Sequence, residues 1–149
     1  MKRASTRSGR AGFTFIELLV VVLIISILAA VVGVAVRRLP GQARVAAAKA
    51  QIGEFKVALE AYHAEQGRFP TQQQGLAALC TAPTAPPLPK NYPDGGYLNS
   101  LAVPKDPWGN DYVYTIPGPG GKPYEVLSYG RDGEPGGTGE DADISSLDL

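Results

Sequence analysis

The sequence predicts an α+β fold in which a long N-terminal helix packs on a small antiparallel sheet and an acidic loop follows. Two observations predict the helix: residues 13–36 are almost entirely apolar, and beyond them apolar residues recur at spacings of three and four. A third predicts the sheet, because from residue 69 onward the chain turns to proline, glycine, tyrosine and short apolar runs. The length of 149 residues allows one small domain after the helix.

The first twelve residues form a basic leader without acidic residues. Its positive charges are Lys2, Arg3, Arg7 and Arg10. A secretory signal peptide has an apolar core of roughly 7–15 residues that ends at an A-x-A-like site. Residues 13–36 are longer and no such site closes them. As a helix they would span about 36 Å, enough for a hydrocarbon core of about 30 Å. We therefore predict a transmembrane helix over residues 13–36, with the leader on the cytoplasmic side.

Glu17 is the only charged residue within residues 13–36. A carboxylate at membrane depth is costly and is rarely present without a partner. A plain signal anchor would explain the length of the apolar segment and the basic leader. It would explain neither Glu17 nor Gly12, which stands where the basic sequence turns apolar.

The stretch from Gly12 to Glu17 reads G-F-T-F-I-E and resembles the type III signal of type IV pilins and type II secretion pseudopilins. The resemblance implies that a prepilin peptidase cuts between Gly12 and Phe13 and that Phe13 is then N-methylated. It also implies a role in assembly for Glu17. The α-amino group of Phe13 on a neighbouring subunit would pair with this carboxylate and set the axial register of the packed helices.

Residues 37–66 are predicted to continue the helix as an amphipathic segment. One apolar stripe, expected to pack on the globular domain, consists of Val45, Ala48, Ile52, Phe55, Leu59 and Tyr62. Lys56 and Glu60 lie off this stripe at i, i+4, and we expect them to be simply solvated. Gly67 fits the end of the helix. Pro40 predicts a kink or a short break just before it.

Residues 67–149 are predicted to form a small globular domain. A short helical segment is expected within residues 75–80. Two strand candidates, residues 111–116 and 124–129, flank a loop of proline and glycine at residues 117–121. This pattern predicts an antiparallel hairpin.

Three motifs in this domain narrow the resemblance. They read F-P-T-x-x-x-G-L-x-A-L at residues 69–79, G-Y-L at residues 96–98 and P-K-D-P-W-G-N-x-Y at residues 104–112. All three look like motifs of the major pseudopilins of type II secretion, which implies the type IV pilin-like version of the α+β fold. We expect Trp108 to be a core aromatic that caps the sheet, the alternative being an exposed anchor for a partner. The single Cys80 is expected to be a small core residue rather than a reactive thiol.

The acidic loop spans residues 129–144. Five carboxylates lie among glycines between Asp132 and Asp143. Glycines let a loop fold back, and converging oxygens suit Ca²⁺. The spacing fails the EF-hand pattern, and the calcium-binding β-roll repeat G-G-x-G-x-D occurs only once, at residues 136–141. The residues alone therefore leave a solvated acidic loop as an open alternative.

The resemblance implies one structural Ca²⁺ in this loop. Asp132, within Y-G-R-D-G, and Asp143, directly before Ile144, would be side-chain ligands. Asp141 is the next candidate. The backbone carbonyl of Tyr129 would contribute a further oxygen, and other carbonyls would complete the shell.

No constellation for catalysis is evident in the sequence. His63 is the only histidine, which argues against a histidine-based triad or zinc site, and no Walker-type phosphate loop is present. Without the leader the chain carries ten basic and fourteen acidic residues, so no basic patch suggests nucleic acid as a partner. We therefore predict a protein that is not an enzyme.

The predicted function is structural. The resemblance implies a subunit of the periplasmic pseudopilus of a type II secretion system. Before polymerising with copies of itself, it would cross the bacterial inner membrane once, with its C-terminal domain in the periplasm. The implied partners are minor pseudopilins, the prepilin peptidase, and the assembly platform with its ATPase. Two alternatives stay open: a type IV pilus subunit, and a membrane-anchored calcium-binding module that never polymerises.

Overall fold

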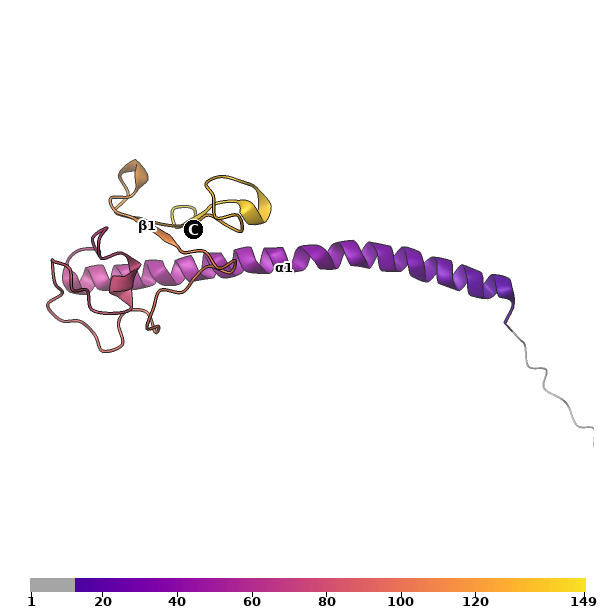
Figure 1. Ribbon diagram of the computed structural model, residues 1–149, viewed down its shortest axis with the longest axis horizontal. Helices are drawn as coiled ribbons and strands as arrows, with labels where there is room; N and C mark the ends of the chain where they lie inside the picture. Colours follow the sequence, from indigo (N-terminus) through magenta and orange to yellow (C-terminus); the bar gives the residue numbers. More distant parts are fainter. Residues whose placement is uncertain (1–12) are drawn as a thin grey trace, which may run out of the picture. The chain divides into compact units, whose positions relative to one another are not determined.

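The structure is a computed structural model that describes residues 13–149, except for the side chains of residues 30–40 (Figure 1). The chain divides into two compact units, Met1–Leu39 and Pro40–Leu149. Helix α1 (Phe15–Gln66) begins in the first unit and ends in the second. All later elements belong to the second unit.

Helix α1 is assigned as one helix of 52 residues. The helix continues on both sides of Pro40 although the proline removes one donor, so the short break is not found; the kink, which was the other form of this prediction, stays a prediction. The next residue, Gly41, is buried against the side chain of Glu140, so packing supports the helix at this point. The predicted helix end is confirmed. Gly67 has a φ of 72°, and its N–H donates to the carbonyl of His63 at 2.8 Å, which closes the last turn.

The predicted apolar stripe of α1 forms the core of the second unit. Its fully buried members are Ala48, Ile52, Phe55, Leu59 and Tyr62, while Val45 packs at the margin. They meet aromatic residues from the sheet and from the loop before it. The ring of Phe55, for example, lies edge-on to that of Tyr112 with the centroids 5.0 Å apart. Cys80 is buried in the same core, as predicted.

The sheet has three antiparallel strands in the order β1 (Val113–Thr115), β2 (Glu125–Ser128) and β3 (Ile144–Ser145). Figure 1 labels β1. The predicted hairpin is confirmed as β1 and β2, both shorter than expected, and the predicted short helix is the 3-10 helix η1 (Leu76–Leu79). Strand β3 was not predicted, because two residues are too few to show an alternating pattern. Its pairing with β2 places the acidic loop between two neighbouring strands.

Asp106 fixes the turn that precedes β1. Its buried carboxylate accepts hydrogen bonds from the N–H groups of Trp108 and Asn110 at 3.1 and 2.8 Å. It also accepts one from the hydroxyl of Ser128 at 2.7 Å. A buried carboxylate with three donors is well satisfied. The turn is thereby tied to the end of β2, where the acidic loop begins.

Candidate assembly segment and acidic loop

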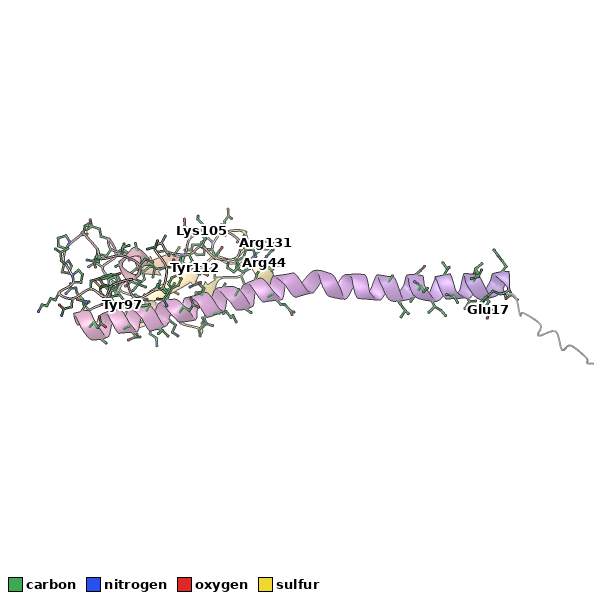
Figure 2. All side chains as sticks on the ribbon, turned by 90° about the horizontal axis from the view of Figure 1, so that it is seen from below. Glu17, Arg44, Tyr97, Lys105, Tyr112 and Arg131 are labelled. Atoms are coloured by element: carbon green, nitrogen blue, oxygen red, sulfur yellow. The ribbon has the colours of Figure 1, made fainter. Side chains whose placement is uncertain are left out.

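The first turn of α1 is capped by Thr14. The Oγ1 atom of Thr14 accepts a hydrogen bond from the N–H of Glu17 at 3.3 Å, and its carbonyl accepts one from the N–H of Leu18 at 3.3 Å. The sequence T-F-I-E has the spacing of a capping box, S/T-x-x-E, a signal that our reasoning from the sequence missed. Glu17 therefore lies in the first helical turn, where the helix dipole favours a carboxylate (Figure 2).

The helix segment that carries Glu17 is apolar and unpartnered in the single chain. From Phe13 to Leu28, every large hydrophobic side chain is 44% exposed or more. A contiguous exposed apolar surface of this kind is typical of a segment that contacts protein or membrane.

No helix within the described part of the chain meets the length and hydropathy needed to cross a membrane. The predicted span over residues 13–36 runs into residues 30–40, whose side chains lie outside the described part. The leader and Gly12 also lie outside it, so of the predicted cleavage site only Phe13 is described.

The acidic loop is anchored at its base by Gly130. A side chain there would collide with the backbone oxygens of Glu140 and Ala142, and its φ is 69°. The side-chain amide of Asn110 donates to the carbonyl of Gly130 at 2.8 Å. The N–H of Arg131 donates to the carbonyl of Glu140 at 2.8 Å. The two ends of the loop are thereby held together by the backbone.

An ion pair bridges the same two ends. The guanidinium of Arg131 donates from Nε and Nη2 to the two carboxylate oxygens of Asp141, both at 2.8 Å. This hydrogen bonding to the Asp141 carboxylate raises the pKa of Arg131. Isolated surface ion pairs contribute little to stability, but bidentate geometry is the exception. The guanidinium of Arg131 therefore supplies a positive charge within the acidic loop.

Glu140 joins the loop to the rest of the second unit, a role that the sequence did not reveal. Its Oε2 atom accepts a hydrogen bond from the indole N–H of Trp108 at 3.3 Å and lies 3.8 Å from Arg44 of α1. Its Oε1 atom lies 3.9 Å from Arg131. The labelled Arg44 and Arg131 can be followed in Figure 2. Trp108 is partly buried against the core, so its ring packs on the fold while its polar end holds Glu140.

The predicted calcium ligands lie in this loop but do not form a cage. Asp132 accepts from the N–H of Glu134 at 3.2 Å, and Asp143 accepts from the N–H of Gly136 at 3.0 Å. Both oxygens of Asp141 are engaged by Arg131. Within the described residues, no group of three or more His, Cys, Asp or Glu side chains is placed to hold a metal ion. Asp132 and Asp143 each accept one backbone hydrogen bond while Asp141 is bound to Arg131, and the calcium site with its three aspartates stays a prediction.

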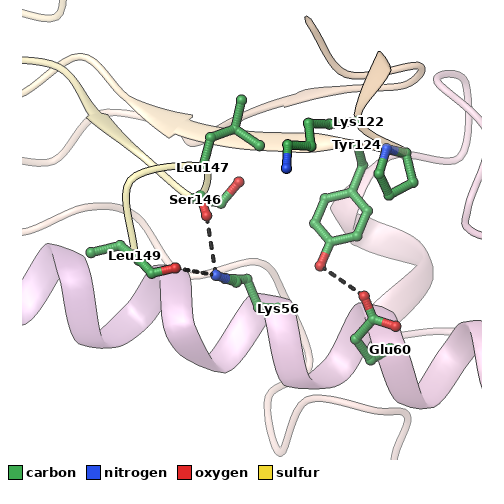
Figure 3. Close-up of a pocket in the computed structure, with 8 residues that line it drawn as sticks. Lys56, Glu60, Lys122, Tyr124, Ser146, Leu147 and Leu149 are labelled. Atoms are coloured by element: carbon green, nitrogen blue, oxygen red, sulfur yellow. Dashed lines mark hydrogen bonds between the residues drawn. The ribbon is translucent and has the colours of Figure 1, made fainter. Parts of the chain in front are cut away.

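Lys56 and Glu60 were predicted to be simply solvated, and this prediction is wrong. The ammonium of Lys56 donates to the backbone oxygens of Ser146 and Leu149 at 3.1 and 2.7 Å (Figure 3). Glu60 accepts from the hydroxyl of Tyr124 at 3.3 Å, and burial together with this carboxylate raises the pKa of Tyr124 to about 12. Polar side chains next to an apolar stripe can hydrogen-bond to segments that pack across the helix. The spacing of residues along the helix does not show such contacts.

Two family descriptions match the chain. Residues 35–147 match "Type II secretion system (T2SS), protein G", and residues 7–33 match "Prokaryotic N-terminal methylation motif". Among similar proteins is the type II secretion system core protein G of Pseudomonas aeruginosa, 46% identical over 142 residues, which cover 95% of this chain and 98% of that protein. The core protein G of Vibrio cholerae is 43% identical over 143 residues, with 94% of this chain and 93% of that protein covered.

A solved structure is also similar: the crystal structure of the major pseudopilin from the type 2 secretion system of enterohaemorrhagic Escherichia coli. It matches with a TM-score of 0.61 and 33% identity, covering 72% of this chain and 90% of that one. The fold and the sequence therefore point to the same family.

Proposed function

The chain belongs to the protein G family of type II secretion systems and is a major pseudopilin, and from this premise we propose that α1 packs copies of it into a periplasmic fibre. The main support for this proposal is the apolar surface from Phe13 to Leu28, which is exposed in the single chain and interrupted by one charge. Neighbouring copies of the same helix would bury this surface. The role is structural, in keeping with the prediction that the chain is not an enzyme.

Glu17 is proposed to set the register of this packing. Its partner would be the α-amino group of Phe13 on a neighbouring copy, released when residues 1–12 are removed. The match of residues 7–33 to the N-terminal methylation motif supports cleavage between Gly12 and Phe13 and methylation of Phe13. A copy placed out of register would bury both charges unpaired, at a cost of about 3–5 kcal/mol.

The rest of the pathway follows from the family. We place the unassembled chain in the inner membrane through one span over residues 13–36, with the second unit in the periplasm. Its partners would be minor pseudopilins, the prepilin peptidase, and the assembly platform with its ATPase. The family match names type II secretion, which disfavours a type IV pilus subunit.

A structural Ca²⁺ in the acidic loop is a further part of the proposal. Asp132, Asp143 and the carbonyl of Tyr129 would hold it, and other backbone carbonyls would bring the oxygens to the six to eight that calcium takes. When bound, the ion would neutralise carboxylates that otherwise repel one another. Asp141 would remain with Arg131.

The test of the assembly role is Glu17→Ala, with Glu17→Gln beside it. Both variants keep the N–H that Thr14 caps, so the start of the helix is preserved. We expect normal leader removal, loss of fibres and loss of secretion for both, because the cation on Phe13 would have no partner. Thr14→Ala is the control and should lower helix stability by about 1 kcal/mol without abolishing fibres. Normal secretion from either Glu17 variant would contradict the register proposal.

A further inference from the structure

Exposed hydrophobic side chains in the second unit gather at two places. Residues 41–149 are all described, and the large hydrophobic residues exposed among them are Val57, Leu88, Leu101, Leu147 and Leu149. Val57, Leu147 and Leu149 line two hollows beside α1, and Leu101 follows the lining residue Asn99 by two positions in the sequence. Clustering of this kind indicates contact surfaces rather than scattered exposure.

The first hollow, the glycine groove, lies between α1 and the loop before β1. It has a volume of about 700 Å³ and is lined by Ala50, Gly53, Glu54, Val57, Ala58, Tyr97, Leu98 and Asn99. Val57 is 72% exposed in it, and Leu101, two residues beyond its rim, is 91% exposed. Glu54 supplies a negative charge.

No contact within a single chain explains why a glycine stands at position 53 of the helix. Glycine inside a helix is less stable than alanine. A Cβ at this position would meet no atom within 4 Å, so nothing in the chain requires the small residue. A missing side chain that leaves open space fits the close approach of another molecule.

The second hollow, the lysine groove, lies between α1 and the C-terminal segment. It has a volume of about 230 Å³, and Lys56, Glu60, Lys122, Tyr124, Leu147 and Leu149 are among its lining residues (Figure 3). Leu147 and Leu149 are exposed there. In the part of the chain that the structure describes, the Lys122 ammonium makes neither a hydrogen bond nor an ion pair, and Figure 3 draws none to it.

The two grooves lie on opposite flanks of the buried stripe of α1. Glu54 and Lys56 are two residues apart, which is about 200° around a helix with 3.6 residues per turn. One flank offers open apolar space and a carboxylate. The other offers exposed leucines and a free ammonium.

We propose that the glycine groove of one copy receives Leu147 and Leu149 of the next copy, with Lys122 facing Glu54. The inference rests on the proposed function, because it supplies a contact between globular units in the fibre. A contact between two different surfaces of one chain does not close on itself as a twofold dimer does. It leaves one groove free at each end and, unless its rotation closes a ring, propagates into a helical filament such as the proposed fibre. A second copy fits better than another protein, because every copy carries both complementary surfaces.

Paired cysteines test the contact in fibres assembled from the full chain. Cys80 is buried, so introduced cysteines provide the exposed thiols. We expect Val57→Cys with Leu147→Cys to give, on oxidation, a ladder of dimers, trimers and longer chains. Either cysteine alone should give no cross-link, whereas a twofold contact would stop at dimers in the double variant and give no ladder. Leu88→Cys with Leu147→Cys is the matched control and should give no ladder.

Charge exchange tests the same contact without cysteines. Glu54→Lys and Lys122→Glu should each reduce fibre yield at least tenfold, and the double variant should restore it. Lys90→Glu, at an exposed lysine outside both grooves, should change nothing. Gly53→Leu should raise the melting temperature of the unassembled chain, since the side chain has room, and still block assembly.

Fibres of normal yield without a ladder, or without the charge effect, would overturn the proposed contact and leave the role in the fibre intact. Failure of the unmodified chain to form fibres at all would instead remove the proposed function.

Discussion

Glu140 and Asp141 are neighbours in the sequence with separate tasks in the acidic loop. Glu140 reaches outward to Trp108 and Arg44, and Asp141 reaches across the loop to Arg131. The sequence predicted an acidic loop but not which partner each carboxylate has. The spacing of the carboxylates is the same whether they bind a metal or pair with a basic side chain. Only the position of Arg131 decides between them. Asp141 is the predicted site residue that the structure pairs with a cation, and its role as a calcium ligand stays a prediction.

The calcium proposal makes opposite predictions for two aspartates. Asp132→Ala should abolish the rise in melting temperature that Ca²⁺ produces, because it removes a ligand. Asp141→Ala should keep that rise and lower the melting temperature in the presence of EDTA, because Arg131 loses both of its hydrogen bonds. Thermal unfolding of the two variants and the unmodified chain, with and without Ca²⁺, measures both effects. An unchanged calcium shift in Asp132→Ala would remove that residue from the site.

At the scale of elements, the sequence was most informative where a pattern repeats. The stripe of α1 spans several turns, and five of its six predicted residues are fully buried; Val45 is only partly buried, and the buried Ala58 was not predicted. Strands β1 and β2 alternate and flank a glycine-rich loop, so the hairpin was also predicted. Strand β3 has two residues and depends on pairing with β2. The break at Pro40 was predicted from local chemistry, and packing of Glu140 on Gly41 opposes it.

Two glycines of the acidic loop allow the cost of a steric collision to be measured separately from the cost of a left-handed backbone conformation. Gly130 and Gly139 have nearly equal φ values, 69° and 67°, but only Gly130 has backbone atoms where a side chain would stand. Gly139→Ala should cost about 1–2 kcal/mol from the left-handed conformation. Gly130→Ala should cost about a further 1–3 kcal/mol from the collision. Denaturant unfolding of both variants measures the difference, and equal losses would show that the two chain segments separate readily.

At the scale of the whole molecule, the two units divide the work between them. The first carries the exposed apolar surface and Glu17, and the second carries the core, the acidic loop and the two grooves. The apolar surface of the first unit and its single charge could be predicted from the sequence, because apolar residues with one charge form a linear signal, whereas cleavage and register stay predictions. The grooves could not, since Lys122 and Leu147 meet Lys56 only after folding.

Processing is a property of the whole chain and has a direct measurement. The intact mass of the protein recovered from its native membrane should show the loss of residues 1–12 and the gain of one methyl group. Removal of the leader frees the α-amino group that Glu17 requires. A mass that includes Met1 or Lys2 would indicate an unprocessed anchor and would end the proposal of a charge pair between neighbouring copies.

The contact between Trp108 and Glu140 has a practical consequence. Trp108 is the only tryptophan in the chain, and its indole N–H points to the residue that joins the acidic loop to α1. Its intrinsic fluorescence therefore reports on the docking of that loop, with no dye and no substitution. Titrating calcium into the protein while recording the emission maximum would follow the loop directly, in solution and during assembly.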